Sequence, residues 1–333
     1  MDLNLTWFVL LGVLLAGYAI LDGFDLGVGI IHPILGGERE RSIAIKAIGP
    51  LWDGNEVWLV TFGGALFAAF PEAYATILSS LYLPIMLLLF CLILRAVSID
   101  FYSKVESRFW KLIWDCGFTI SSLGATIVFG VAAGILIQGI PLDERGVYSG
   151  SLMELVTPYS LATGGLAVTV FAMHGTMFLY LKTTGQVRQR LGRWIWHTWG
   201  LFLIAYVLVS MMTLIENPHV VATVKRMPWA IPIVIINVLC VANIPRAVQN
   251  EAYGKAFVSS CVNIFCLVAL FSISTFPNLV YSISDSSSLT IYNAASSQGT
   301  LWLMTIFAMI GVPLIASYTA IVYWTFRQPI SEA

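Results

Sequence analysis

The sequence has 333 residues, of which 58% are hydrophobic and only 11% are charged, and its mean hydropathy is +0.85. This composition excludes an ordinary soluble domain and indicates a polytopic membrane protein. The formal net charge of −1 provides no basic surface, so nucleic acid is not an expected partner. We therefore expect the partners of this chain within the bilayer.

The cysteines and the N-terminus also indicate a membrane protein. No CxxC or Cys/His spacing typical of a metal site occurs, and the thiols lie in apolar runs, which predicts buried free cysteines. The N-terminus lacks the basic region and cleavage site of a removable signal peptide, so its apolar run should remain as a membrane helix. The cysteines are Cys91, Cys116, Cys240, Cys261 and Cys266.

Nine segments have the roughly 20 mostly apolar residues that a membrane-spanning helix needs. We expect an all-α fold that forms a single transmembrane domain over residues 1–333. The seventh segment is the weakest because three prolines crowd it. The expected helices lie near 5–33, 52–70, 75–97, 112–138, 159–182, 194–215, 228–245, 254–276 and 300–326.

The positive charges predict how the chain crosses the membrane, because loops rich in Lys and Arg stay in the cytoplasm. Among the expected loops, those on one side hold only Arg145, Lys225 and Arg226, and the remaining 14 of the 17 basic residues belong to the other side. The N-terminus should therefore lie outside and the C-terminus in the cytoplasm.

Four carboxylates stand inside or beside apolar runs, where an uncompensated charge is costly and functional roles are common. Asp22 and Asp25 share one face of the first helix, and Asp53 and Glu56 repeat the same spacing at the cytoplasmic start of the second. The connection between these helices is short, so they should be antiparallel neighbours. The pattern predicts a line of carboxylates from the cytoplasm toward the bilayer centre.

Two further polar features have simpler interpretations. Arg95 and Asp100 end the third helix, and we expect an ion pair between them at the membrane surface, with an inner carboxylate as the alternative partner of Arg95. Among the histidines, only His174 lies well inside an expected helix, and a buried structural role is favoured over haem ligation.

Four blocks of this sequence resemble subunit II of the cytochrome bd-type quinol oxidases. The first two are Leu21-Asp-Gly-Phe-Asp-Leu-Gly-Val-Gly29 and Trp52-Asp-Gly-Asn-Glu-Val-Trp-Leu-Val60. The others are Arg95-Ala-Val-Ser-Ile-Asp100 and Ser288-Leu-Thr-Ile-Tyr-Asn-Ala-Ala-Ser-Ser-Gln298. The blocks occur in the family's order, and the resemblance spans nearly the whole chain.

The resemblance implies nine helices in two four-helix bundles plus one peripheral helix, in the bacterial cytoplasmic (inner) membrane. It implies a partner, subunit I, which carries two b-type haems and one d-type haem, oxidises quinol and reduces dioxygen to water. This chain would bind no haem. A small accessory subunit, quinol and lipid are further expected partners, and whether a quinone binds this chain is left open, as is the choice between ubiquinol and menaquinol.

The resemblance also assigns roles to single residues. Asp22 and Asp53 match the aspartates of a proton path from the cytoplasm, whereas Asp25 and Trp52 match the motifs with less defined roles. Glu56 stands where the family accepts either glutamine or glutamate. Arg95 and Asp100 belong to the matching third block and are expected to support the site.

Two alternatives from other classes remain at this point. One is a secondary transporter that couples substrate movement to protons on the buried aspartates, although no clear inverted repeat or pair of broken helices supports it. The other is a purely structural scaffold of the oxidase, in which the carboxylates only accept hydrogen bonds.

Overall fold

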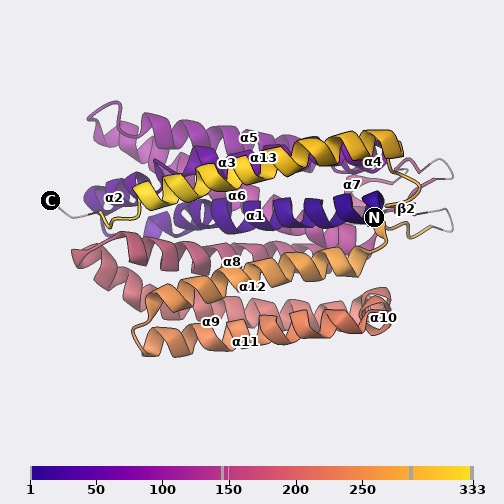
Figure 1. Cartoon of the computed structure of the whole chain (residues 1–333). Coiled ribbons are helices and arrows are strands. Elements are labelled where there is room, and N and C mark those ends of the chain that lie inside the picture. The colour runs from indigo at the N-terminus through magenta and orange to yellow at the C-terminus, as the bar shows by residue number, and fades with distance from the viewer. Residues whose placement is uncertain (1, 144–145, 149, 285–287, 331–333) are drawn as a thin grey trace.

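The structure is a computed structural model that describes residues 2–143, 146–148, 150–284 and 288–330. It is a bundle of long helices that run along a common axis (Figure 1). The N-terminus and the short strands β1 and β2 lie at one end, here the N-terminal end, and helix α2 lies at the other, the C-terminal end. The strands, Asn278–Val280 and Leu289–Thr290, pair antiparallel.

The helices account for most of the described chain. Their bounds are α1 Leu3–Ile31, α2 Glu38–Ile48, α3 Trp52–Ala69, α4 Pro71–Ser80, α5 Tyr82–Phe101, α6 Arg108–Gln138, α7 Leu152–Leu155, α8 Pro158–Lys182, α9 Gly185–Glu216, α10 Pro218–Arg226, α11 Ile231–Gln249, α12 Tyr253–Thr275 and α13 Gln298–Thr325. Single 3-10 turns, His32–Ile34 and Pro228–Ala230, follow α1 and precede α11.

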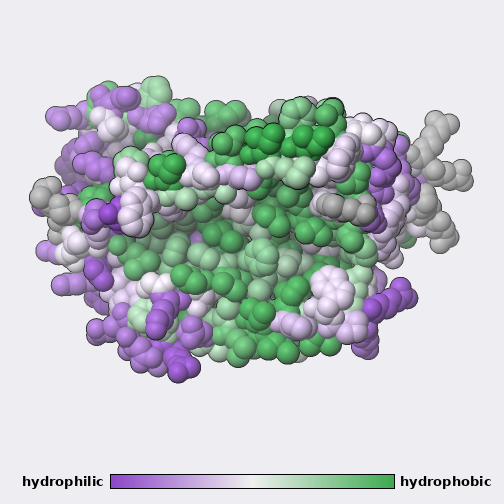
Figure 2. Space-filling view, viewed as in Figure 1, coloured by the Kyte–Doolittle hydropathy of each residue, from purple (hydrophilic) through white to green (hydrophobic). Residues whose placement is uncertain are grey.

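Eight described stretches are long and apolar enough to cross a membrane: α1, α5, α6, α8, α9, α11, α12 and α13. The pair α3 and α4, bent by 119°, makes a ninth if it is one span. Apolar side chains cover the middle of the visible surface, whereas hydrophilic side chains gather at both ends of the bundle (Figure 2). The expectation of an all-helical, multi-pass membrane protein is confirmed.

The predicted helix over 75–97 is wrong at its start. Helix α3 ends at Ala69, and Phe70 adopts φ −137° and ψ 66° before Pro71 begins α4. A second break at Leu81, with φ −104° and ψ 28°, separates α4 from α5. Proline starts a new helix because its φ is fixed and it has no N–H to donate. The break at Leu81 lies inside an apolar run, where hydropathy gives no signal.

Helix α1 is the centre of the bundle and packs against α3, α6, α8, α12 and α13. Its contact with α8 is close because Gly27 faces Gly175 and the backbone of Phe171. Small residues let membrane helices approach in this way. The tight contact fixes the position of the second half of α1, which carries Asp22 and Asp25.

Helix α2 was not predicted, because residues 34–51 have the composition of a polar loop. It buries one apolar face, including Ile43, Ile45 and Ile48, at the C-terminal end of the bundle. Glu38 lies in its first turn and Lys46 in its last, where both charges complement the helix dipole. The connection between α1 and α3 is therefore ordered, and the two helices are neighbours as expected.

The close contact of α1 with α8 yields a first prediction. A Cβ atom at Gly27 would overlap the backbone oxygen of Phe171, so Gly27→Ala should lower the free energy of unfolding by about 1–3 kcal/mol. The matched control is Gly165→Ala on α8, where nothing lies within 4 Å of the added carbon. Thermal unfolding of the detergent-extracted protein measures the difference. Equal melting temperatures for both variants would contradict this packing.

Candidate functional site

Three helices meet at a buried ion-pair cluster. Arg95 of α5 places its Nη1 2.8 Å from the carboxylate of Asp22 on α1, and its Nη2 donates to Oε1 of Glu56 on α3. The side chains of Asp22 and Arg95 are 0% exposed, whereas that of Glu56 is 26% exposed. One guanidinium thus holds two carboxylates, one in the interior and one toward the surface.

Asp25 belongs to a second network beside this cluster, in which its partners are uncharged side chains. Its Oδ2 accepts a hydrogen bond from Nδ2 of Asn55 on α3 at 2.7 Å. The same amide nitrogen donates to the carbonyl of Leu21 at 3.1 Å, and Asn55 Oδ1 accepts from the hydroxyl of Tyr323 on α13 at 3.0 Å. Asp25 and Asn55 are both buried. The two aspartates share one stretch of α1 but have different partners.

Several buried polar atoms here have no hydrogen-bond partner among the described residues. They are the hydroxyl of Tyr18, one oxygen of Asp25 and Nε of Arg95, whereas both oxygens of Asp22 lie 2.8 Å from Nη1 of Arg95. Buried polar atoms are ordinarily bonded to protein or to ordered water, and water needs two or more polar partners. Hydroxyl, carboxylate and guanidinium groups together offer such partners, so this part of the interior is suited to hold water.

The other two predicted residues of this region lie at the start of α3. Asp53, in the first turn, is exposed. It is near enough to Glu56 for the two charges to interact. Trp52 is half-buried and packs against the hydrophobic core. The structure therefore places Asp53, Glu56 and Asp22 in succession from an exposed helix start to the interior.

The expected ion pair between Arg95 and Asp100 is wrong. Arg95 is buried and binds Asp22 and Glu56, which was the alternative interpretation, whereas Asp100 is exposed and joins none of the ion pairs seen among the described residues. The two side chains are five residues apart, about 140° around the helix, so they cannot share a partner on one face.

Three residues of this site were missed by sequence reasoning. Asn55 lies between Asp53 and Glu56 in the second motif, and a polar residue at the start of an apolar helix was a usable signal. Tyr18 is one turn before Asp22 on the same face of α1, which its spacing could also have indicated. Tyr323 is 268 residues from Asn55 in sequence, and no local pattern connects them.

A second set of ion pairs lies at the C-terminal end. His32 Nε2 is 2.6 Å from Oδ1 of Asp115 on α6, and Arg41 Nη1 of α2 donates to its Oδ2 at 3.0 Å. Tyr102 is buried nearby, where burial and the charge of Asp115 raise the pKa of its hydroxyl. Two further pairs, Lys111 with Glu38 at 2.5 Å and Arg190 with Glu40 at 3.0 Å, attach α2 to α6 and α9. These contacts fix α2 over the end of the bundle.

The structure gives His174 a structural role. Its Nδ1 is 2.7 Å from the hydroxyl of Ser260, its Nε2 is 3.0 Å from the carbonyl of Ile20, and its ring stacks on Phe257. An iron ligand needs a free imidazole nitrogen, so this residue does not fit haem ligation. Among the described residues, no three His, Cys, Asp or Glu side chains are placed to hold a metal ion.

The cluster around Arg95 yields a second prediction. Arg95→Gln would leave the carboxylates of Asp22 and Glu56 without their cation, so it should destabilise the protein by about 3–5 kcal/mol. The exposed Arg108→Gln is the control and should change stability by less than about 0.5 kcal/mol. The double variant Asp22→Asn with Arg95→Gln should recover part of the loss, as measured by thermal unfolding in detergent. An Arg95→Gln protein as stable as the control would contradict the buried pairing.

Comparisons with known proteins agree with this architecture. The sequence profile of the family described as cytochrome bd terminal oxidase subunit II matches residues 3–326. Cytochrome bd-I ubiquinol oxidase subunit 2 of Escherichia coli (strain K12) is 36% identical over 366 aligned positions, which cover 99% of this chain and 96% of the relative. Cytochrome bd ubiquinol oxidase subunit 2 of Bacillus subtilis (strain 168) is 33% identical, with 98% and 96% covered.

The fold also has a solved counterpart. A chain of the bd oxidase from Geobacillus thermodenitrificans superimposes with a TM-score of 0.81 at 17% identity, over 98% of this chain and 99% of that one. The family profile, the relatives and the solved fold thus each match nearly the full length of this chain. The chain belongs to the cytochrome bd terminal oxidase subunit II family.

Proposed function

We propose that this chain is the haem-free second subunit of a quinol:oxygen oxidoreductase and that it carries protons from the cytoplasm toward a haem-bearing subunit I. Asp53 receives the proton and Asp22 passes it on. The observation that supports this path is the succession from exposed Asp53, through half-buried Glu56, to fully buried Asp22. The orphan polar atoms beside Asp22 mark where water would bridge the remaining steps.

Arg95 and Glu56 have supporting roles in this proposal. The permanent charge of Arg95 offsets part of the cost of burying an ionised Asp22. Glu56 holds the other side of the guanidinium and keeps the space between Asp53 and Asp22 polar. Carboxylates suit the transfer because they accept and release protons along hydrogen-bonded chains. Asp25, which is bonded to neutral Asn55, helps to position this segment of α1.

The direction of transfer follows from the proposed orientation, with the N-terminus outside and the C-terminal end in the cytoplasm. Asp53 starts α3 at the C-terminal end, beside α2 with its basic residues Arg39, Arg41 and Lys46. Protons would enter from the cytoplasm, while subunit I releases quinol protons outside. Such an enzyme builds a proton gradient without a pumping cycle.

The exposed side of α3 is the proposed contact with subunit I. Val60 and Phe67 are strongly exposed on this helix, and nothing lies within 4 Å of a carbon added at Gly63 or Gly64. Open small residues let a second helix approach closely. If subunit I binds on this side, it would cover Glu56. Its haems would then lie closer to Asp22 than if it bound another side of this chain.

The haems of the complex are proposed to lie in subunit I, where they supply electron transfer and oxygen chemistry. Within the described part of this chain, both nitrogens of His174 are hydrogen-bonded and the cysteines are dispersed free thiols. The residues present therefore do not fit haem ligation at His174. A quinone bound by this chain, and an accessory subunit, remain expectations of the family resemblance.

The direct test replaces the two proposed carriers. Asp22→Asn and Asp53→Asn should leave the haem content of the purified complex unchanged and slow quinol-driven oxygen uptake at least about tenfold, because a positioned proton carrier is lost. Asp100→Asn is the matched control, since Asp100 is exposed and outside the cluster. Full turnover in both variants would refute the path and leave a structural scaffold. A chain purified without haem or subunit I, from membranes that retain oxidase, would favour a transporter instead.

Glu56 gives a separate prediction. Glu56→Gln keeps an oxygen that accepts from Arg95, so the complex should assemble normally and unfold within about 1 kcal/mol of the parent. Because the proton passes between Asp53 and Asp22 through water, oxygen uptake should fall by less than about threefold. A loss as large as that of Asp22→Asn would make Glu56 an obligatory carrier and overturn its supporting role.

A further inference from the structure

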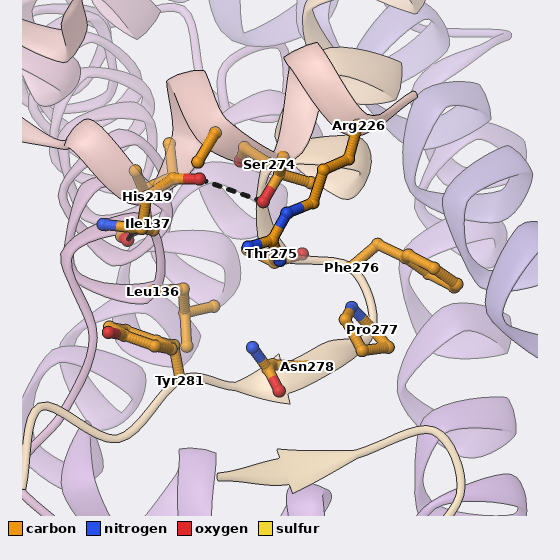
Figure 3. A pocket seen from close by; sticks show the side chains of 12 residues that line it. Leu136, Ile137, His219, Arg226, Ser274, Thr275, Phe276, Pro277, Asn278 and Tyr281 are labelled. Atoms are coloured by element: carbon orange, nitrogen blue, oxygen red, sulfur yellow. Dashed lines mark hydrogen bonds between the residues drawn. The ribbon is translucent and has the colours of Figure 1, made fainter. Parts of the chain in front are cut away.

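A cavity of about 240 Å³ opens at the N-terminal end of the bundle, far from the cluster around Arg95. It lies between the ends of α6, α10 and α12 and the chain segment that leads into β1 (Figure 3). Its polar lining includes His219 and Arg226 of α10, Thr275 of α12 and Asn278 of β1. Nothing in the proposed proton path uses this cavity.

The cation of the cavity is Arg226, an exposed side chain without an ionic partner in the described part of the chain. The side chain of Arg226 reaches from α10 into the cavity and ends beside Thr275 (Figure 3). It makes no ion pair or hydrogen bond with the residues that the structure describes, and the described lining contains no Asp or Glu. A guanidinium offers five N–H donors in a planar fork that matches phosphate and carboxylate oxygens. The cavity therefore favours an anion.

The walls are held in place before any ligand arrives. His219 Nε2 is 2.8 Å from the carbonyl of Ile137, and its ring stacks on Tyr281 with centroids 4.8 Å apart. Asn278 pairs with Thr290 through the strands, which keeps its side-chain amide at the rim of the cavity. The site thus has a fixed frame and a cationic fork, with the amide of Asn278 as a neutral donor at its rim.

The position of the cavity indicates which anion reaches it. Helix α10 lies across the end of the bundle, roughly perpendicular to the spanning helices (Figure 1). It is followed by Trp229, which is 60% exposed, and by Ile231, which is 50% exposed. Exposed Trp beside a basic residue at the end of a spanning helix is typical of the headgroup level of a bilayer. Phosphate is the abundant anion at that level.

We propose that this cavity is a phosphate-binding site in which Arg226 pairs with two phosphate oxygens and Asn278 donates to a third atom of the group. A phospholipid headgroup and inorganic phosphate both carry this chemistry. The exposed apolar surface beside α10 suits acyl chains, so a lipid would bind with its phosphate in the cavity and its chains along α11. The proposal does not depend on the oxidase function.

The test compares variants of the intact, purified complex. After delipidation, phosphatidylglycerol is added, and the lipid retained is counted by native mass spectrometry at a series of concentrations. Arg226→Gln should weaken retention at the tightest site about tenfold, the loss expected for a charge-assisted bidentate contact. Arg226→Lys should retain part of the affinity. Lys225→Gln, which removes an adjacent exposed charge outside the lining, is the control and should bind as the parent does.

Two further experiments identify the source of the phosphate and test whether a loss of binding is due to misfolding. Displacement of the lipid by millimolar inorganic phosphate would assign the site to free phosphate, and resistance would assign it to the lipid headgroup. If Arg226→Gln fails to assemble, Ala222→Phe fills the cavity while Arg226 remains, with Ala222→Ser as its control. Unchanged retention of the lipid together with unchanged binding of inorganic phosphate in Arg226→Gln, or in Ala222→Phe, would overturn the proposal.

Discussion

The buried guanidinium of Arg95 is the constraint on which the interior of this protein depends. It is the cation that the structure places between two carboxylates from different helices, Asp22 and Glu56. Removing the charge of Arg95 leaves two carboxylates without their cation, in a medium where a bare charge costs several kcal/mol. Helices α1, α3 and α5 must therefore keep their relative positions, and the close glycine contact of α1 with α8 fixes the same segment from its other side.

A hydrogen-bond network through Asn55 extends this constraint to helix α13 on the outside of the bundle. Helix α13 buries little of its surface, with Leu301 and Thr305 as its buried residues. Its Tyr323 nevertheless donates to Asn55, which in turn holds Asp25. A hydrogen bond to a buried amide is worth about 1 kcal/mol and adds direction that apolar packing lacks. The last helix is thus tied to the same stretch of α1 as the ion-pair cluster.

Sequence reasoning predicted the features that hydropathy and helical periodicity encode. Asp22 and Asp25 were expected on one face of a buried helix, and the structure confirms their burial and their shared location. The break at Leu81 and helix α2 escaped prediction, because the first lies within an apolar run and the second within a polar one. The partner of Arg95 could not be predicted from the sequence either. Arg95 binds Asp22, which is 73 residues away, and not Asp100, because the packing of the helices decides which face of α5 is buried.

Three ion-paired basic residues at the C-terminal end differ in their surroundings from Arg226 at the N-terminal end. At the C-terminal end, acids and bases pair with each other, as in Asp115 with His32 and Arg41, and these pairs fix α2 in place. At the N-terminal end, Arg226 has no such partner among the described residues, although it lies in a cavity with a preformed frame. A guanidinium without an ionic partner keeps its full capacity to bind an anion. Arg41, Lys111 and Arg190 thus hold helix α2 at one end, whereas the proposed role of Arg226 at the other end is to bind an anion.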